Sequence, residues 1–107
     1  MNDLGRTDII KLIALAEKPL NLRGVNLSMA KLMYLDLTGA DLENANLGTE
    51  LRGALLVNCY LYNADLTGAT LKNADLTDAD LTGALLKDAD LTGATLKNAD
   101  FSGTILE

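Results

Sequence analysis

Apolar and polar residues follow one another with a period of five residues from residue 20 to residue 107. In this frame the third position is Leu in 17 of 18 units, with Phe101 as the exception, and the first position is Ala in 12 of them. The pattern is most regular over residues 64–103, which read ADLTG ATLKN ADLTD ADLTG ALLKD ADLTG ATLKN ADFSG. Two positions in every five are therefore predicted to face inward, one small and one large.

The residue types at the fifth position predict a turn in every unit. Of the 16 complete units, seven end in Gly, five in Asn and two in Asp, which are the residues that tolerate positive φ. A type II turn at the fourth and fifth positions follows. Met29 and Tyr34 are the exceptions, and their corners are expected to adopt a turn that needs no positive φ.

A period of five excludes a helix, because steps of five rotate the Leu positions around the helix surface. Four short extended sides separated by corners instead close a square coil, and each side pairs with the coils above and below at about 4.8 Å. The A(D/N)LXX pattern resembles the pentapeptide repeat family over residues 20–107. The resemblance implies an all-β solenoid, a right-handed quadrilateral β-helix (the repeated five-residues fold) of about four coils.

The frame slips once, because Leu47 and Leu51 are four residues apart. One residue is missing near Gly48, which predicts either a tightened corner or a small bulge. The slip is interpreted as a tolerated irregularity or as the mark of a functional site.

Residues 1–19 do not share the repeat and predict a short amphipathic helix over about residues 7–18. Its apolar positions are Ile9, Ile10, Leu12, Ile13, Leu15 and Ala16, with Thr7 or Asp3 as the N-cap and Pro19 just beyond the end. The helix is interpreted as a cap on the open end of the stack, with a membrane-surface or partner helix as the alternative. The chain is thus one domain, with a capping helix and linker at 1–19 and the β-helix at 20–107.

Composition argues against catalysis. The chain has no His and a single Cys, Cys59, which excludes an internal disulfide and a thiolate metal cluster. Asp recurs at the second position, where paired carboxylates would suit acid–base chemistry or calcium, yet the regular repetition favours a solvated face. No phosphate-binding glycine motif is present. We therefore expect no catalytic residue, no metal and no cofactor, and Cys59 is expected to be a buried small residue.

The net charge of −6, from 15 acidic and 9 basic residues, argues against direct binding to nucleic acid. The chain lacks a signal peptide and an apolar stretch that could span a bilayer, so a cytoplasmic protein without membrane contact is expected. The family includes acidic members that resemble a DNA duplex and act on DNA gyrase. The resemblance therefore leaves two functions open, a small non-enzymatic protein-interaction module with an unknown protein partner, or an acidic DNA mimic that binds a type II topoisomerase such as DNA gyrase.

Candidate contact residues are the apolar ones at positions predicted to face water. Leu55, Val57, Tyr60 and Tyr62 occupy the second and fourth positions of two successive units, which predicts an exposed corner for a partner. The alternative is that surface apolar residues are scattered, or that Tyr60 packs between neighbouring Asp ladders. Leu85 and Ile105 are predicted to stack on another side, and Met33 and Tyr34 to add apolar surface nearer the helix.

The last coil predicts a second contact surface. Phe101, Ile105 and Leu106 are expected near its open end. A homodimer through this uncapped C-terminal coil is therefore a further hypothesis.

Overall fold

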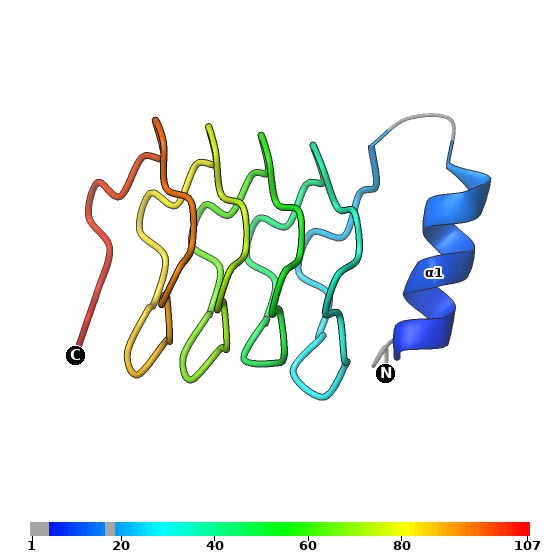
Figure 1. Ribbon diagram of the computed structural model, residues 1–107, viewed down its shortest axis with the longest axis horizontal. Helices are drawn as coiled ribbons and strands as arrows, with labels where there is room; N and C mark the ends of the chain where they lie inside the picture. Colours follow the sequence, from blue (N-terminus) through cyan, green and yellow to red (C-terminus); the bar gives the residue numbers. More distant parts are fainter. Residues whose placement is uncertain (1–4, 17–18) are drawn as a thin grey trace.

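The computed structural model describes residues 5–16 and 19–107. One helix, α1 (Arg6–Leu15), lies at one end of a stack of coils, and the C-terminus lies at the other end (Figure 1). The coils pair through isolated parallel bridges between second-position residues, such as Tyr60 with Asp80. The partners of a bridge lie one coil apart, so the chain winds continuously along a single axis.

Each coil has four sides joined by corners. Within a corner the first-position N–H donates to the C=O of the Leu three residues earlier, as from Ala64 to Leu61 at 3.0 Å. Between coils the Leu61 N–H donates to the Asp80 C=O at 2.7 Å, and the Asp80 N–H donates back to the Cys59 C=O at 3.0 Å. These bonds tie each side to its neighbour in register.

The corners have the predicted turn geometry. The Gly, Asn and Asp residues at the fifth positions all have positive φ, between 57° and 75°. The fourth-position residues of these corners are outside the positive-φ set, and this combination is that of a type II turn. The prediction from residue type is therefore confirmed for all 14 of these units.

Of the two exceptional corners, one follows the prediction and one does not. Met29 has no positive φ, as predicted, whereas Tyr34 has a φ of 63°. The Tyr34 N–H donates to the Arg52 C=O of the next coil at 2.9 Å. Its ring covers Gly53, where an added Cβ would overlap the ring carbons. The inter-coil contacts therefore hold Tyr34 in the left-handed region despite its side chain.

The slip near Gly48 is a tightened corner. The Thr49 N–H donates to the Leu47 C=O at 2.6 Å, two residues earlier instead of three. The Thr49 hydroxyl also donates to the Ala30 C=O in the preceding coil. A Cβ on Gly48 would lie 2.8 Å from the Thr67 C=O oxygen, so the short corner leaves no room for a side chain.

The slip and the Met29 corner lie one on top of the other. Parallel bridges flank both corners, from Asn26 to Asn46 before them and from Lys31 to Glu50 after them. The second pair is 19 residues apart and the first is 20, so the missing residue is absorbed within this one corner. The register of every later side is preserved.

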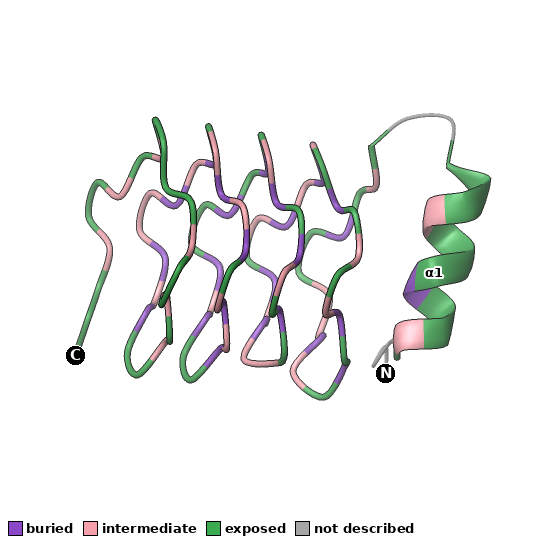
Figure 2. Ribbon diagram, in the orientation of Figure 1, coloured by how far each residue is buried: buried purple, intermediate pink, exposed green. Residues whose placement is uncertain are grey.

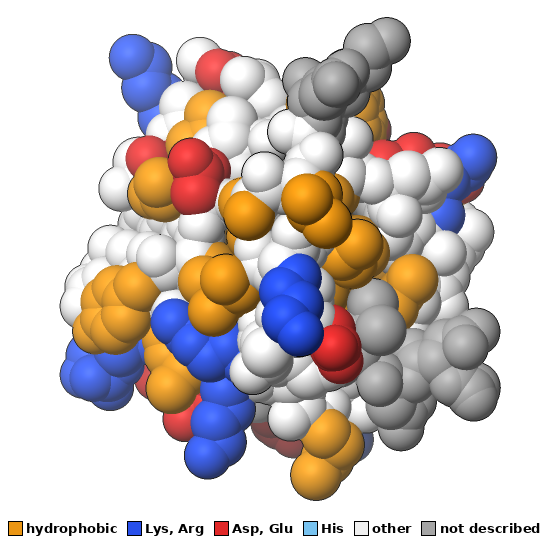
Figure 3. Space-filling model, turned by 90° about the vertical axis from the view of Figure 1, so that its right-hand side faces the viewer, with side chains coloured by type: hydrophobic (Ala, Val, Ile, Leu, Met, Phe, Trp, Pro, Cys, Tyr) orange, Lys and Arg blue, Asp and Glu red, His pale blue; other side chains and the backbone are white. Residues whose placement is uncertain are grey.

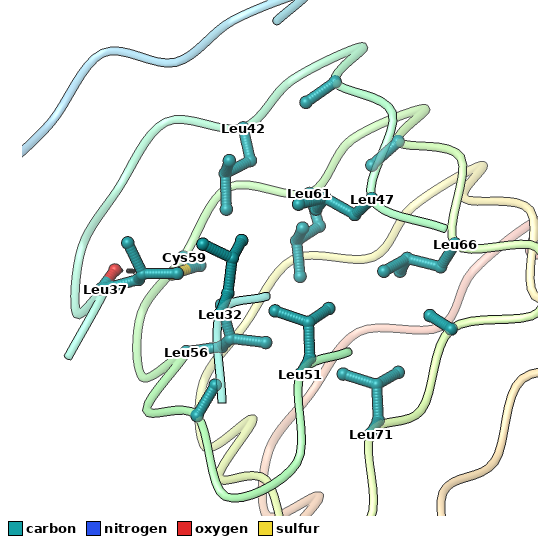
Figure 4. Close-up of a cluster of buried hydrophobic side chains, with 14 of the residues drawn as sticks. Leu32, Leu37, Leu42, Leu47, Leu51, Leu56, Cys59, Leu61, Leu66 and Leu71 are labelled. Atoms are coloured by element: carbon teal, nitrogen blue, oxygen red, sulfur yellow. Dashed lines mark hydrogen bonds between the residues drawn. The ribbon is translucent and has the colours of Figure 1, made fainter. Parts of the chain in front are cut away.

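Leu and Ala side chains fill the interior of the stack. Third-position residues from Leu22 to Leu86 are at most 4% exposed, and most first-position residues between them are buried as well. Figure 2 shows buried segments recurring in successive coils, and Figure 4 shows Leu side chains of successive coils pointing into the interior. The inward orientation predicted for the first and third positions is confirmed over this range.

The helix is shorter and less buried than predicted. It ends at Leu15 instead of about residue 18, because Ala16 has an extended backbone. Only Ile9 is buried and Ile13 half-buried, since residues four apart share one helix face, whereas Ile10 and Leu15 are exposed. Figure 3 looks onto this end of the molecule, where hydrophobic side chains show at the surface.

The helix N-cap also differs from the prediction. Gly5 is the N-cap, and its N–H donates to Asp8 Oδ2 at 3.2 Å. Thr7 lies inside the helix, and the other candidate, Asp3, lies outside the described residues. Arg6 attaches the helix to the stack, because its Nη1 donates to the C=O groups of Lys31 and Met33 at 2.9 and 2.8 Å.

Candidate partner-binding surface

Asp and Asn at the second position have a structural role. Their side-chain oxygen accepts the N–H of the fourth-position residue two places later, as Asp75 Oδ1 does from Thr77 at 3.0 Å. The Thr77 hydroxyl donates to the same oxygen at 2.5 Å. This Asx turn explains why Asp and Asn repeat at this position. The Asp-x-Thr spacing that recurs in the sequence is the pattern from which the turn could have been predicted.

Hydroxyl donors keep several of these carboxylates ionised. The pKa values of Asp36, Asp75, Asp90 and Asp100 lie below their ordinary value of 3.8, chiefly because a Thr or Ser side chain two residues later donates to each carboxylate. The backbone N–H of the same residue adds to the effect. These groups therefore act as fixed negative charges and N–H acceptors near neutral pH.

Within the described residues, no three His, Cys, Asp or Glu side chains are grouped so that they could hold a metal ion. The second-position carboxylates are instead distributed over different sides of the coil. Cys59 is buried in a first-position slot, and its Sγ donates to the Leu37 C=O at 2.9 Å (Figure 4). Burial raises the pKa of its thiol from 9.0 to about 12, so the thiolate is absent near neutral pH.

Two adjacent units replace the Asx residue with an apolar one. Leu55 and Tyr60 lack a short side-chain acceptor and cannot make the Asx turn. Their side chains are 40% and 56% exposed, Tyr62 is 42% exposed, and Val57 is half-buried. The structure thus brings the four predicted residues to the outside of two adjoining sides. We name Leu55, Val57, Tyr60 and Tyr62 the apolar corner.

The apolar corner lies in the middle of the stack. Leu55 pairs with Asp36 in the coil before it and with Asp75 in the coil after it. Tyr60 pairs with Asp41 and Asp80 in the same way. The corner is therefore bordered by carboxylate-bearing residues on both sides along the axis, at the strand spacing of about 4.8 Å.

The remaining apolar candidates lie apart from this corner. Leu85 and Ile105 pair with each other on a different side, as predicted, and Ile105 is 46% exposed. Met33 is half-buried, and Tyr34 is 68% exposed over its coil contact with Gly53.

Apolar side chains become accessible again in the last coil. Leu96 is 38% exposed and Leu106 is 69% exposed, although both occupy the third position that is buried earlier in the chain. Phe101 is half-buried and packs against the core. The C-terminal coil therefore carries an accessible apolar edge.

Stacked four-sided coils, built from five-residue units with a third-position Leu, define a repeat solenoid. The model of the family described as pentapeptide repeats matches this chain in eight copies, over residues 20–48, 48–83 and 71–107. The chain therefore belongs to the pentapeptide repeat family.

Solved structures agree with this assignment. The crystal structure of a pentapeptide repeat protein from Nostoc is 32% identical, covers 100% of this chain and 99% of its own, and superposes with a TM-score of 0.82. One from the Arabidopsis thaliana thylakoid lumen is 29% identical, covers 81% of this chain and 65% of its own, with a TM-score of 0.54.

More distant matches add nothing about function. The plasmid-mediated fluoroquinolone resistance protein QnrB1 is 18% identical, with 84% of this chain and 67% of its own covered and a TM-score of 0.41. No curated protein sequence matches the chain significantly.

The helical residues that the structure describes include no segment with the length and hydrophobicity needed to span a bilayer.

Proposed function

We propose that this protein is a non-enzymatic interaction module of the cytoplasm, which captures a protein partner on the apolar corner. One observation carries the proposal: two successive units place exposed Leu and Tyr side chains at second and fourth positions, where most other units have Asp or Asn and a polar residue. Giving up an Asx turn removes a side-chain hydrogen bond, worth about 0.5–1.5 kcal/mol. A contact with a partner would offset the stability that is lost with this hydrogen bond.

The chemistry of the corner supports this function. Tyr is among the residues enriched at the energetically dominant positions of protein interfaces, because it has a large apolar area and few rotatable bonds. Tyr60 and Tyr62 are attached to a coil whose neighbouring Leu61 is fully buried. The two rings therefore project from a rigid backbone, which lowers the entropic cost of binding.

The proposal assigns α1 the role of a cap on a right-handed coil. Ile9 belongs to the core cluster and Arg6 hydrogen-bonds to Lys31 and Met33, so the helix covers backbone and apolar surface at the first coil. An exposed sheet edge is a template for pairing with other chains, and a helix across it prevents such pairing.

Affinity capture from the source cells tests the proposed function. The wild-type chain should retain a partner that the Tyr60→Ser/Tyr62→Ser variant loses, because truncation of two interface Tyr residues typically costs at least about 2 kcal/mol. Met29→Ser is the matched control, since Met29 is 85% exposed but lies at another corner. Equal capture by the wild type and the double variant would refute the assignment of the apolar corner.

A second candidate function is mimicry of a DNA duplex toward a topoisomerase. The favouring observation is the repeated row of carboxylates, several of which have pKa values below their ordinary range. Residues 59–107 carry eight acidic and three basic residues, a net charge of −5. A supercoiling assay with purified gyrase separates the two functions: inhibition or protection at micromolar protein supports mimicry, and neither effect supports the interaction module.

A further inference from the structure

The charges around the apolar corner are distributed unevenly over the four sides of the coil. The two ladders of paired second-position residues that contain Leu55 and Tyr60 hold five carboxylates and no cation, namely Asp36, Asp41, Asp75, Asp80 and Asp100. The other two ladders hold three carboxylates and Lys31. Among the paired second-position residues, the two ladders of the apolar corner therefore carry the greater negative charge.

Three of the carboxylates next to the corner form no ion pair with another described residue. Both ion pairs among the described residues use Arg23, with Asp41 at 3.4 Å and Glu43 at 2.9 Å. Asp36, Asp75 and Asp80 take no part in them. The charges of Lys72 and Arg52 contribute to lowering the pKa of Asp90, which lies on a different ladder.

A cavity adjoins this acidic surface at the first coil. It has a volume of about 250 Å³ and lies between α1 and the coil, with Ile13, Leu20, Asp36 and Thr38 among its lining residues. Since Asp36 also pairs with Leu55, the cavity and the apolar corner share a border. An apolar cavity of about 150 Å³ already accommodates a benzene ring, so this one is large enough for a bulky side chain.

We propose that the partner presents a basic peptide segment with a bulky apolar side chain. The apolar side chain occupies the cavity beside Asp36, and Lys or Arg side chains lie against Tyr60 and between Asp36, Asp75 and Asp80. A cation over a Tyr ring is attracted by the negative face of the ring, and carboxylates on the same surface add to the attraction. This inference rests on the proposed function and identifies the chemical class of the partner.

The negative charge of this surface favours a cationic peptide over other partners. Phosphates of nucleic acids and anionic lipid head groups would be repelled by these carboxylates. A purely apolar peptide would offer no cation to them.

Selection from a displayed library of random peptides of about ten residues tests the inference. The immobilised full-length chain should enrich peptides with a net positive charge and at least one Leu, Phe or Trp. Binding of the best peptide, synthesised with a fluorescent label, should weaken as salt rises from about 50 mM to about 500 mM, because exposed charges become screened. Enrichment of acidic or uncharged peptides, or no enrichment, would overturn the proposal.

Substitutions in the protein locate the contact. Asp36→Asn/Asp75→Asn/Asp80→Asn removes the three charges while each Asn still accepts the Asx-turn N–H, so the coil should fold normally. The labelled peptide should bind about tenfold more weakly to this variant. Asp65→Asn/Asp90→Asn, on the other two ladders, is the matched control and should bind like the wild type. Equal affinity for all three proteins would contradict the proposed charge recognition.

The cavity is tested separately with Ala16→Trp, because Ala16 lines the cavity and is exposed. The indole should weaken binding of the selected peptide and should not affect a version in which its bulky apolar residue is Ala. Equal weakening of both peptides would exclude the cavity as the anchor site.

Different results would refute the interaction module and the basic partner. If Tyr60→Ser/Tyr62→Ser loses the cellular partner while the triple Asn variant retains it fully, the interaction module stands and the basic partner is refuted. If neither variant loses the partner, both are refuted.

Discussion

A fifth position in this coil can favour glycine for two separate reasons, a positive φ and a lack of space for a Cβ next to the neighbouring coil. Only the first reason applies at Gly68, which has a φ of 72° and nothing within 4 Å of where a Cβ would be. Both reasons apply at Gly53, because its φ is 66° and the Tyr34 ring covers the Cβ position. Glycines with the same place in the repeat are therefore not equivalent.

Two Ala substitutions separate these requirements. Gly68→Ala should cost about 1–2 kcal/mol of unfolding free energy, the price of a left-handed backbone for a residue with a Cβ. Gly53→Ala should cost about 1–3 kcal/mol more, because the Tyr34 ring must move. Urea unfolding of both variants measures the difference. An equal loss for both would show that the Tyr34 ring does not restrict Gly53.

Tyr34 shows what residue type alone does not predict. As a residue with a large side chain, Tyr34 is expected in a turn without positive φ. The hydrogen bond from its N–H to the Arg52 C=O and its contact with Gly53 instead favour the left-handed region of backbone conformation. Both contacts come from the next coil and have no local signal in the sequence. Propensity predicted the Gly, Asn and Asp corners because there the local and inter-coil preferences agree.

The Asx carboxylates predict a dependence of stability on pH. Asp75, Asp90 and Asp100 have pKa values below 3.8 in the fold, mainly because Thr or Ser hydroxyls donate to them. A lowered pKa favours the folded state above the unfolded value, and this contribution is lost as pH falls through the folded value. Stability should therefore be level near neutral pH and fall below about pH 4.

An Asp75→Asn/Asp90→Asn/Asp100→Asn variant is the control for this dependence. Its amide oxygens still accept the turn N–H groups but do not titrate. Urea midpoints measured from about pH 6 to about pH 3 should decline less steeply for the variant than for the wild type. Parallel declines would show that other carboxylates cause the acid sensitivity.

At the scale of elements, the sequence predicted the helix but not its contacts. Apolar residues between Ile9 and Ala16 are compatible with several helix faces, and which face is buried depends on how the helix lies on the first coil. The bonds from Arg6 and the burial of Ile9 fix that orientation. The cavity beside Asp36 was unpredictable for the same reason, because it exists only between two separately formed elements.

Two substitutions in α1 test how the helix is held. Ile9→Ala should cost about 2–5 kcal/mol of unfolding free energy, because Ile9 is 0% exposed and belongs to the core cluster. Leu15→Ala should change stability by no more than about 0.5 kcal/mol, since Leu15 is 80% exposed. Chemical denaturation gives both values. A small effect of Ile9→Ala would contradict the role of α1 as a cap.

At the scale of the whole molecule, the five-residue period predicted the order of the ladders and the side on which each second-position residue lies. The pairings of Leu55 with Asp75 and of Leu85 with Ile105 follow from counting four units a coil. Counting succeeds because each coil contacts only its neighbours, so the register is transmitted from one coil to the next. The residues that share a surface are thereby predictable from the sequence, whereas the partner that binds to that surface is not.

The accessible edge of the last coil leads to the remaining prediction. We propose that two copies of this chain meet through Phe101, Ile105 and Leu106. Apolar area removed from water contributes about 25 cal/mol per Å², and a coil that ends in exposed Leu side chains regains this contribution when a second coil covers it. Light scattering in the high micromolar range should therefore give twice the mass of one chain.

Leu106→Asp should restore a monomer in the same measurement, because a charge buried in an apolar interface without a partner is strongly unfavourable. Leu106 is 69% exposed, so the substitution should leave the fold intact. Leu15→Asp places the same charge on an exposed Leu at the opposite end and should remain dimeric if the interface is the last coil. A monomeric wild type in the high micromolar range would exclude the dimer, and dissociation by Leu15→Asp instead would place the interface at α1.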